Sequence, residues 1–192
     1  MRDVNYWDEI TTIFDWARTH VTSTLYICWA AQAGLYHFYG VPKYPLKQKM
    51  FGIFRSSYQC TGSCPYSVVL MMSFLLPHSR HTEIHREDIL KVKELALIAE
   101  SDESGVYMAM ARNGREFFIT GHSEYSPYTL DTEYKRDLAK GLPIEMPVNY
   151  YKDDNPDNAP VVRWRGHANL LFSNWLNYYV YQETPFDINQ IR

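Results

Sequence analysis

The stretch that most constrains the fold is residues 21–40, in which a run of β-branched and aromatic residues passes directly into a helical one. "VTSTLYI" predicts a buried strand, and "WAAQAGLYHFYG" predicts a helix that ends at Gly40, with Pro42 just beyond it. Cys28 is the single residue between the two segments. A strand that leads straight into a helix is a building unit of α/β folds, so we expect Cys28 at the carboxyl end of a sheet strand.

The following part of the chain continues this alternation of strand and helix. A helix is expected before the first strand, because apolar residues recur at helical spacing from Trp7 to Ala17 and stop near His20. Further strands are expected at "KMFGIF", "SFLLPHS", "ELALIA", "VYMAMA" and "REFFIT", with a short helix through "REDILKV". The turn segments "SDESG" and "RNG" separate the last three of these strands.

Helices are expected again toward the C-terminal end. Ser126 is suited to cap a helix with Pro127 at its first position, and Gly141 is suited to end it. A final amphipathic helix is predicted for "HANLLFSNWLNYYVYQE", after the loop "DDNPDNAP". Together these elements predict a single α/β domain over residues 1–192, with a mostly parallel sheet flanked by helices.

The distribution of charged and apolar residues excludes several classes of protein. The formal net charge is −3, and basic residues are scattered among acidic ones, so no cationic stripe is available for nucleic acid. The longest apolar run, residues 68–77, is shorter than the roughly 20 residues of a membrane-spanning helix, and "MRDVNYWDEI" lacks a signal peptide's apolar core. A cytoplasmic protein without a nucleic-acid or membrane partner is expected. Three cysteines, an odd number, predict reduced thiols.

Cys28 is the first candidate for chemistry. A thiol at the first turn of a helix faces the positive end of the helix dipole, which favours the thiolate, the nucleophilic form of the side chain. The alternative is that Cys28 is a small buried apolar side chain, as many single cysteines are. Its position alone leaves both interpretations open.

His122 and Glu124 follow directly after the expected strand "REFFIT". Residues i and i+2 that leave a strand point the same way, so Glu124 can hold one ring nitrogen of His122 while the other nitrogen faces a nucleophile. Taken alone, the two residues are equally compatible with a structural or surface pair. In combination with Cys28, also at the end of a strand, they predict a Cys-His-Glu catalytic triad.

Four stretches of the chain resemble one enzyme family. "TSTLYICWAAQAGLYHFYGVPKYPLKQKMFGIF", "PHSRHTEI", "TGHSEY" and "VRWRGHANLLFSNWLNYYVYQETPFDI" are similar to the homoserine O-acyltransferases of the MetA family. The resemblance implies the class I glutamine amidotransferase-like fold. It also implies an enzyme of L-methionine biosynthesis, which transfers an acetyl or succinyl group from acyl-CoA to the hydroxyl of L-homoserine.

The resemblance also assigns roles to residues. Cys28 matches the nucleophile that forms an acyl thioester, and His122, held by Glu124, matches the general base that deprotonates homoserine. The positions that contact the amino-acid substrate in the family fall on Lys49, Ser79 and Arg136. The last suits a carboxylate, because a guanidinium can form two parallel hydrogen bonds.

Without the resemblance, these three contacts would be interpreted as a solvated lysine, a turn serine and a helix-surface arginine paired with Glu133. No cofactor and no metal is implied, since acetyl-CoA or succinyl-CoA is a substrate. "VPKYPLKQKMFG" and "HSRHTEI" resemble the acetyl-using branch more than the succinyl-using one. The family is commonly dimeric, so a homodimer is a further expectation.

The chain begins well inside the family pattern, at "MRDVNYWDEI". We expect the upstream portion to carry the first strands and helices of the fold, part of the substrate pocket and the position that helps to select the acyl donor. A sheet that lacks these strands leaves apolar faces and backbone edges exposed. The 192-residue product alone is therefore expected to be poorly soluble and inactive.

A second departure from the family pattern lies between Arg55 and Ser73. Cys60 and Cys64 form an isolated C-x3-C there, which is a weak zinc signal without a second pair at ligand spacing. The adjacent methionines in this stretch are encoded ATGATG, which reads Asp-Asp one base earlier when the preceding codon ends in G. The family's Gly-Phe-Asp can thus be recovered, and we interpret the stretch as bracketed by two compensating frame changes that leave both cysteines without a chemical role.

Other interpretations remain open at this stage. A glutamine amidotransferase or cysteine hydrolase on the same fold would usually surround its nucleophile with glycines, whereas Cys28 has Ile27 and Trp29 beside it. An inactive fragment of an acyltransferase is compatible with every motif. Both departures from the family pattern favour that fragment.

Overall fold

The computed structural model describes residues 4–59, 73–187 and 189. Within them, a six-stranded sheet has the order β1-β6-β5-β4-β2-β3. The strands are β1 (Thr24–Ile27), β2 (Tyr44–Tyr58), β3 (Ser73–Glu83), β4 (Leu95–Ser101), β5 (Gly105–Ala111) and β6 (Glu116–Ile119). The helices are α1 (Trp7–His20), α2 (Trp29–Tyr39), α3 (Arg86–Leu90), α4 (Thr129–Ala139) and α5 (Arg165–Asn174), which continues as a π-helix, η4 (Trp175–Tyr181). Short 3₁₀ turns are η2 (Arg112–Gly114) and η3 (Lys152–Asp154).

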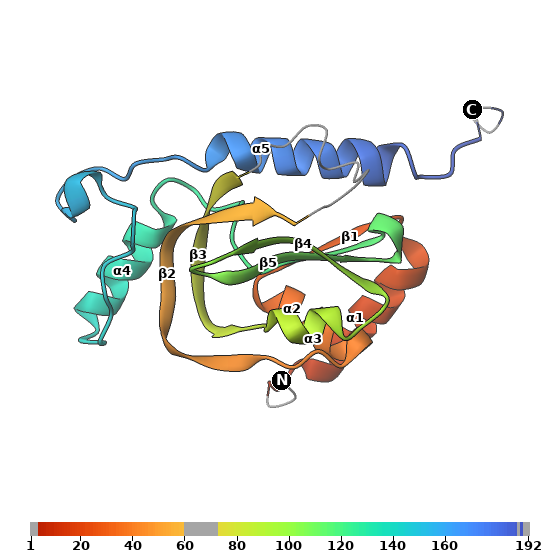
Figure 1. The fold of residues 1–192 in the computed structure, drawn as a ribbon, viewed down its shortest axis with the longest axis horizontal. Coiled ribbons are helices and arrows are strands. Elements are labelled where there is room, and N and C mark those ends of the chain that lie inside the picture. The colour runs from red at the N-terminus through yellow and green to blue at the C-terminus, as the bar shows by residue number, and fades with distance from the viewer. Residues whose placement is uncertain (1–3, 60–72, 188, 190–192) are drawn as a thin grey trace.

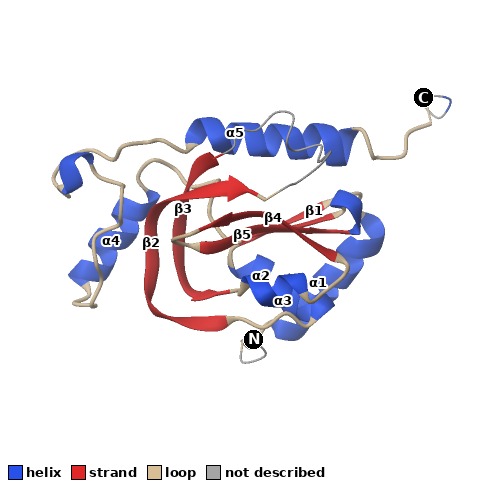
Figure 2. Ribbon diagram, in the orientation of Figure 1, coloured by secondary structure: helices blue, strands red, loops and turns tan. Residues whose placement is uncertain are grey.

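Helices cover the sheet on both faces (Figures 1 and 2). α1, α2 and α3 lie together on one side, α5 runs along the other, and α4 lies beside the bent strands β2 and β3. Each side encloses its own apolar core. Phe117 belongs to the core under α5 and Phe118 to the core under α1 and α2, because successive residues of a strand face opposite sides of the sheet. The expected α/β layer architecture is confirmed.

The sheet is mixed rather than mostly parallel, which corrects the expectation from sequence. In the described residues, β1 and β6 pair in parallel, with Thr24 opposite Glu116 and Ile27 opposite Ile119. The remaining pairs there are antiparallel. The reason is that β4, β5 and β6 are joined by short turns, whereas parallel neighbours need a crossover of about a dozen residues or more.

The predicted strand–helix junction is confirmed. β1 ends at Ile27 and α2 begins at Trp29, with Cys28 alone between them. α2 ends before Gly40, whose φ of 68° lies in the left-handed region that favours glycine. The N–H of Gly40 donates to the carbonyl of Tyr36, so the glycine closes the last turn of the helix.

Other element boundaries differ from those predicted. α4 begins at Thr129 and not at Pro127, because the hydroxyl of Ser126 hydrogen-bonds the Thr129 hydroxyl (2.9 Å) instead of capping a backbone N–H. The helix ends as expected just before Gly141, whose φ is 68°. β2 and β3 are much longer than the short strands predicted, since they pair with each other along a bent ribbon (Figure 1).

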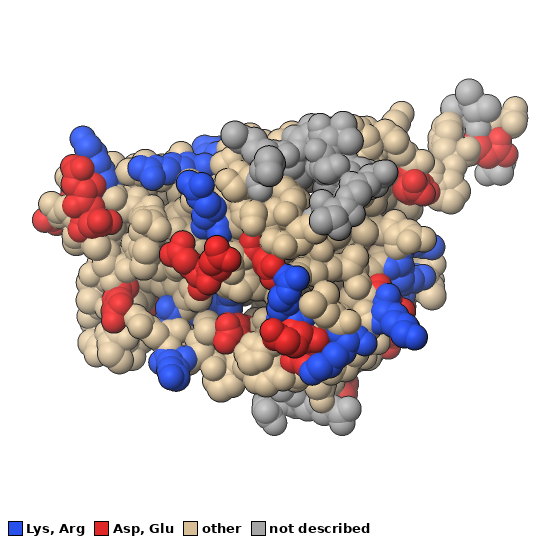
Figure 3. Space-filling view, viewed as in Figure 1, with Lys and Arg blue, Asp and Glu red and all other residues tan. Residues whose placement is uncertain are grey.

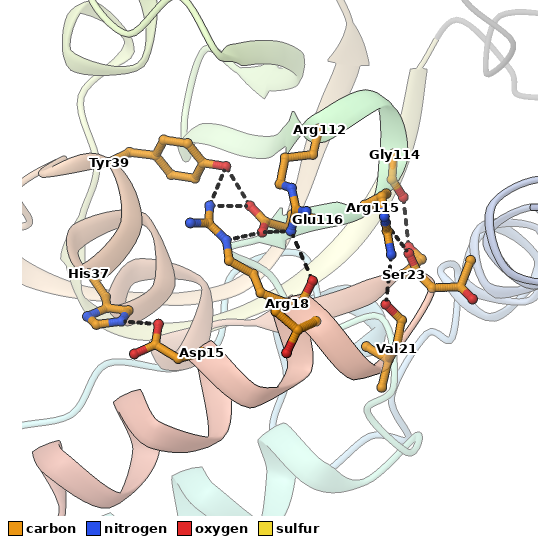
Figure 4. A network of polar contacts seen from close by, with 12 residues as sticks. Asp15, Arg18, Val21, Ser23, His37, Tyr39, Arg112, Gly114, Arg115 and Glu116 are labelled. Atoms are coloured by element: carbon orange, nitrogen blue, oxygen red, sulfur yellow. Dashed lines mark hydrogen bonds and ion pairs between the residues drawn. The ribbon is translucent and has the colours of Figure 1, made fainter. Parts of the chain in front are cut away.

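A buried carboxylate anchors α1 and α2 to the sheet (Figure 4). Glu116, the first residue of β6, accepts hydrogen bonds from Arg18 Nε (2.5 Å), Tyr39 OH (2.5 Å) and Arg112 Nη1 (3.2 Å). Burial raises the pKa of Glu116, but the hydrogen bonds from Arg18 and Tyr39 outweigh burial, so its pKa lies below the ordinary value. This network is at the opposite end of β1 and β6 from Cys28.

Charged side chains of both signs are intermixed on the surface. On the face shown in Figure 3, Lys and Arg lie among Asp and Glu without a large area of one sign, in agreement with the scattered charges of the sequence. None of the helices in the described part of the chain combines the length and the apolar character needed to cross a bilayer.

Candidate active site

Cys28 occupies a strained turn between β1 and α2. Its φ and ψ are 51° and −112°, and a positive φ is unfavourable for residues other than glycine. Backbone hydrogen bonds hold the turn on both sides. The Cys28 N–H donates to the carbonyl of Ile119 (2.7 Å), and the Gln32 N–H donates to the Cys28 carbonyl (3.2 Å). The half-buried thiol therefore lies at the carboxyl end of β1 and at the first turn of α2.

His122 lies at the same edge of the sheet, shortly after β6 ends at Ile119. The backbone N–H of His122 donates to the carbonyl of Pro77 on β3 (2.8 Å). The ring Nδ1 of His122 lies 2.6 Å from Glu124 Oε1. The Cys28 side chain lies close enough to the ring to be one of the groups that raise the pKa of His122. The structure thus brings together the three residues that the sequence combined as a triad, because the parallel neighbours β1 and β6 end side by side.

The surroundings of His122 favour its protonated form. Burial lowers the pKa of His122, but the interactions of the ring with the Cys28 side chain and with the Glu124 carboxylate more than offset burial and raise the pKa to about 9. Glu124 is the more exposed partner, with 41% of its side chain accessible against 14% for His122. At neutral pH the imidazole is therefore protonated and can donate to a thiolate.

Tyr125 fixes the plane of the His122 ring. The two rings are stacked, with centroids 4.1 Å apart and planes 18° from parallel. The backbone carbonyl of Tyr125 accepts a hydrogen bond from Nε1 of the fully buried Trp164 (3.1 Å). Sequence reasoning did not single out Tyr125, although an aromatic residue soon after the histidine in "GHSEY" was a usable signal.

Two of the residues predicted to contact the substrate donate hydrogen bonds to the same carboxylate. Glu133, on α4, accepts hydrogen bonds from three side chains. The donors are Lys49 Nζ (3.1 Å), Ser79 Oγ (2.5 Å) and Tyr125 OH (2.9 Å). Burial raises the pKa of Glu133, but these hydrogen bonds lower it by more, so the carboxylate is held ionised. Lys49 of β2 and Ser79 of β3 thus meet at a group that reaches His122 through Tyr125.

Arg136 lies at the outer rim of this cluster. Its side chain is 53% exposed, and its Nε donates to Asp137 Oδ1 (2.7 Å). Asp137 Oδ2 in turn lies 3.9 Å from Lys49 Nζ. Arg136 therefore pairs with Asp137 and not with Glu133, the partner supposed for it on a helix surface. The sequence signal for Glu133 as a site residue was its place one turn before Arg136, on the same helix face.

A groove opens beside the cluster. Its volume is about 1010 Å³, and its lining includes Lys49, Asp137 and the mainly apolar segment 142–148. Cys28 and His122 do not line this groove. The groove therefore adjoins the outer side of the Glu133 cluster rather than the thiol.

The structure offers no set of metal ligands in the residues it describes. Among residues 4–59, 73–187 and 189, His, Cys, Asp and Glu side chains do not gather in groups of three that could hold a metal ion. Cys60 and Cys64, with the rest of the segment interpreted as a frame change up to residue 72, lie outside the described residues.

Comparison with known proteins assigns the chain to a family. Residues 1–186 match the model of the family described as Homoserine O-succinyltransferase. The chain belongs to the homoserine O-succinyltransferase family. This confirms the resemblance seen in the sequence.

Relatives in the homoserine O-succinyltransferase family are similar over nearly the whole chain. The homoserine O-acetyltransferase of Phocaeicola vulgatus is 90% identical over 99% of this chain and 62% of its own length. That of Bacteroides thetaiotaomicron is 71% identical over 98% of this chain and 62% of its own length, and that of Acetivibrio thermocellus is 58% identical over 99% and 62%. The chain thus spans about 62% of the length of these relatives.

Solved structures of low identity share the fold. A glutamine amidotransferase from Methylobacillus flagellatus has a TM-score of 0.65 over 99% of this chain and 75% of that one, at 9% identity. A glutamine amidotransferase from Thermotoga maritima has a TM-score of 0.57 over 89% and 66%, at 12% identity. These similarities concern the fold alone, and they confirm the amidotransferase-like architecture expected for this member of the homoserine O-succinyltransferase family.

Proposed function

We propose that the protein is a homoserine O-acyltransferase that carries the acyl group as a thioester on Cys28. The observation that supports this most directly is the position of the His122 ring, whose Nδ1 lies 2.6 Å from Glu124 Oε1 and whose pKa is raised by the nearby Cys28 side chain. A nucleophile, a base and a group that orients the base are what acyl transfer through a covalent intermediate requires. Family membership supports homoserine as the acceptor.

In the first half-reaction, the Cys28 thiolate attacks the thioester carbonyl of acyl-CoA. The new sulfur–carbon bond forms as the bond to the sulfur of CoA breaks, and protonated His122 gives its proton to the departing thiolate. The pKa of about 9 keeps this proton on His122 at neutral pH until it is needed. Glu124 stabilises the imidazolium and holds its orientation.

In the second half-reaction, neutral His122 takes the proton of the homoserine hydroxyl as the oxygen attacks the acyl carbon. The bond to Cys28 breaks, O-acylhomoserine leaves, and thiolate and imidazolium are restored. Acylation removes the negative charge of Cys28, which is one cause of the raised pKa of His122. His122 is therefore readily neutral in the acyl-enzyme, where a base is required. The cycle needs no cofactor, since acyl-CoA is a substrate.

The Glu133 cluster fits the amino-acid end of homoserine. Glu133 is an ionised carboxylate that suits the substrate ammonium, and Lys49 and Ser79 already donate to it. Arg136, half-exposed at the rim, can turn its guanidinium to the substrate carboxylate and form two parallel hydrogen bonds. Tyr125 spans from this cluster to His122, so a homoserine held there extends its hydroxyl toward the base.

We propose acetyl-CoA as the preferred donor. The three relatives compared are named homoserine O-acetyltransferase at 58% to 90% identity, whereas the family description names succinyl transfer. These relatives are longer than the chain, so the donor preference is a proposal for the complete enzyme. O-acetylhomoserine is the expected product, on the route to L-methionine that the resemblance implies.

The experiment that tests the function is mass spectrometry of the chain after incubation with acetyl-CoA or with succinyl-CoA. If the chain is active without the upstream portion, an acetyl adduct should form on the Cys28 peptide and be absent from the Cys28→Ser variant. Addition of homoserine should discharge the adduct and release O-acetylhomoserine. An adduct that water discharges equally fast would instead indicate a hydrolase, and folded protein without any adduct would favour an inactive fragment.

A further inference from the structure

Arg80 is a buried cation that the proposed mechanism leaves unused. Only 4% of this β3 residue is exposed. Its guanidinium donates to the carbonyl of Thr82 (2.7 Å), to the carbonyl of Ser104 and to Nδ1 of His78 (3.4 Å), all of which are neutral acceptors. Within the described part of the chain, no carboxylate forms an ion pair with it. A buried charge without an ionic partner is costly, so a compensating charge close by is expected.

On one side, Arg80 is linked to the helix that begins at Cys28. The Thr82 carbonyl that accepts from Arg80 also accepts from Gln32 Nε2 (3.1 Å), and the Thr82 hydroxyl donates to Gln32 Oε1 (2.6 Å). Gln32 lies in the first turn of α2, and its N–H donates to the carbonyl of Cys28 (3.2 Å). The guanidinium is thus linked, through Thr82 and Gln32, to the turn that carries the thiol.

On its other side, Arg80 contacts the residue that packs under the end of β6. His78 is fully buried, and a Cβ placed on Gly121, the residue before His122, would lie 3.1 Å from its Nε2. Burial first, and then the charges of Arg80 and His122, hold the pKa of His78 well below its ordinary value. His78 is therefore neutral and adds no second charge. The guanidinium thus hydrogen-bonds Thr82, which contacts Gln32 of α2, and His78, which lies beside Gly121.

Of the two groups whose negative charge acts on Arg80, Glu83 is directed to the surface and Cys28 lies at the start of α2. Burial lowers the pKa of Arg80, and the charges of Glu83 and then of Cys28 offset this lowering in part. Glu83 is 30% exposed and is paired with His85 (3.4 Å), so its charge is directed to the surface. Cys28 is half-buried, and its other proposed partner is His122.

We propose that Arg80 is a positioning residue for acyl transfer, whose buried positive charge stabilises Cys28 in its anionic form. The inference rests on the proposed function in one respect, which is that Cys28 is the nucleophile. The same charge would serve both half-reactions. It increases the fraction of thiolate that attacks the donor, and it stabilises the thiolate that departs when homoserine takes the acyl group.

The test is the pH dependence of Cys28 alkylation by iodoacetamide, followed by mass spectrometry of the Cys28 peptide. Arg80→Gln and Arg80→Met remove the charge and should raise the midpoint of the rate profile by about one pH unit or more. Alkylation at a pH below both midpoints should then be about tenfold slower. Arg80→Lys retains the charge and should stay near the unchanged chain. Among the described residues, the pKa values of His122 and Tyr125 are also raised by Cys28, and both residues are left intact.

Arg18→Gln is the matched control, because Arg18 is also tied into the fold but contacts Glu116 at the far end of β6. It should leave the Cys28 midpoint unchanged. The proposal is overturned if folded Arg80→Gln or Arg80→Met keeps the original midpoint of the alkylation profile. It is also overturned if Arg80→Lys and Arg80→Gln raise that midpoint equally. Alkylation uses neither homoserine nor acyl-CoA, so failure of the transferase assay would leave this result intact.

A measurement on the unchanged chain covers the case in which neither neutral variant folds. The guanidinium Nε resonance of Arg80 is followed by NMR before and after Cys28 is alkylated to a neutral adduct. We expect the Arg80 resonance to shift while that of Arg18 stays in place. An Arg80 resonance that does not respond to loss of the thiolate would overturn the proposal.

Discussion

The backbone N–H of Cys28 donates a 2.7 Å hydrogen bond to the carbonyl of Ile119. This bond ties the first residue beyond β1 to the last residue of β6, where the two parallel strands end together. Cys28 has a positive φ at this point, and its side chain lies near the histidine that follows β6. The strained turn and the catalytic geometry proposed for it thus lie at one place, where β1 and β6 end together.

Tyr125 is expected to act through two separable contacts. Tyr125→Phe keeps the ring stacked on His122 but removes the hydrogen bond to Glu133 (2.9 Å), so the KM for homoserine should rise about tenfold. Tyr125→Leu removes the stack as well and should also reduce kcat. Steady-state kinetics in homoserine, with Cys28 alkylation as a control for an intact nucleophile, provides the measurement. Equal effects of Phe and Leu on kcat would contradict a separate role for the ring.

Glu124→Gln should lower the pKa of His122 from its value of about 9. Removing the carboxylate removes one of the causes that raise it, while burial continues to lower it. Because the folded-state pKa lies above the ordinary 6.5, the stabilisation due to protonated His122 is complete below pH 6.5 and is lost as the pH rises through about 9. NMR titration of the ring measures the change. Glu133→Gln is the control and should leave the pKa of His122 near its original value. An unchanged pKa of His122 in Glu124→Gln would argue against the His122–Glu124 pair.

The sequence predicted those site residues that depend on local order. Cys28 follows a strand directly, and His122 and Glu124 follow another, so strand ends sufficed to combine them. The convergence of Lys49 and Ser79 on Glu133 could not be predicted from spacing, because it depends on the bend of the β2–β3 ribbon. Such contacts between distant segments leave no periodic signal in any one of them.

The sheet direction was missed for a related reason. Alternating strands and helices favour parallel pairing, but that pattern holds only around β1 and α2. From β4 to β6 the connections are short turns, which favour antiparallel neighbours. The turn segments "SDESG" and "RNG" were already visible in the sequence, so a greater weight on them would have predicted this half of the sheet.

Gly52→Ala should strongly destabilise the fold. A Cβ at Gly52 would lie 2.4 Å from the backbone N and O of Val148, and its φ of 141° is unfavourable for other residues. Backbone atoms cannot move aside as a flexible side chain can, so we expect a loss of about 3 kcal/mol or more in the free energy of unfolding. Chemical denaturation measures it. Gly166→Ala, where a Cβ meets nothing within 4 Å, should be neutral or stabilise by up to about 1 kcal/mol.

Glu116→Gln should weaken the attachment of α1 and α2 to the sheet. Arg18 and Arg112 lose their anionic partner, so a loss on the order of 3 kcal/mol is expected at neutral pH. The folded-state pKa of Glu116 is depressed, so its contribution is complete above the ordinary 4.5 and is lost as the pH falls through the folded value. Chemical denaturation between pH 7 and pH 3 should show that the free energy of unfolding falls less with acid in the variant than in the unchanged chain. Asp157→Asn, at an exposed site, should match the unchanged chain throughout.

Cys28→Gly should be more stable than Cys28→Ala, although neither variant can form an acyl adduct. The φ of 51° and ψ of −112° at this position suit glycine, whereas alanine keeps the strain of the natural residue. After allowance for the greater freedom of glycine in the unfolded chain, we expect a difference of about 1 kcal/mol in the free energy of unfolding. Ala33→Gly in the middle of α2 provides the opposite case. Glycine is unfavourable in a helix, so this substitution should lower the free energy of unfolding by about 1 kcal/mol. If Cys28→Ala proves as stable as Cys28→Gly, the turn is not strained. In that event the hydrogen bond to Ile119 would hold the thiol without opposing a backbone preference.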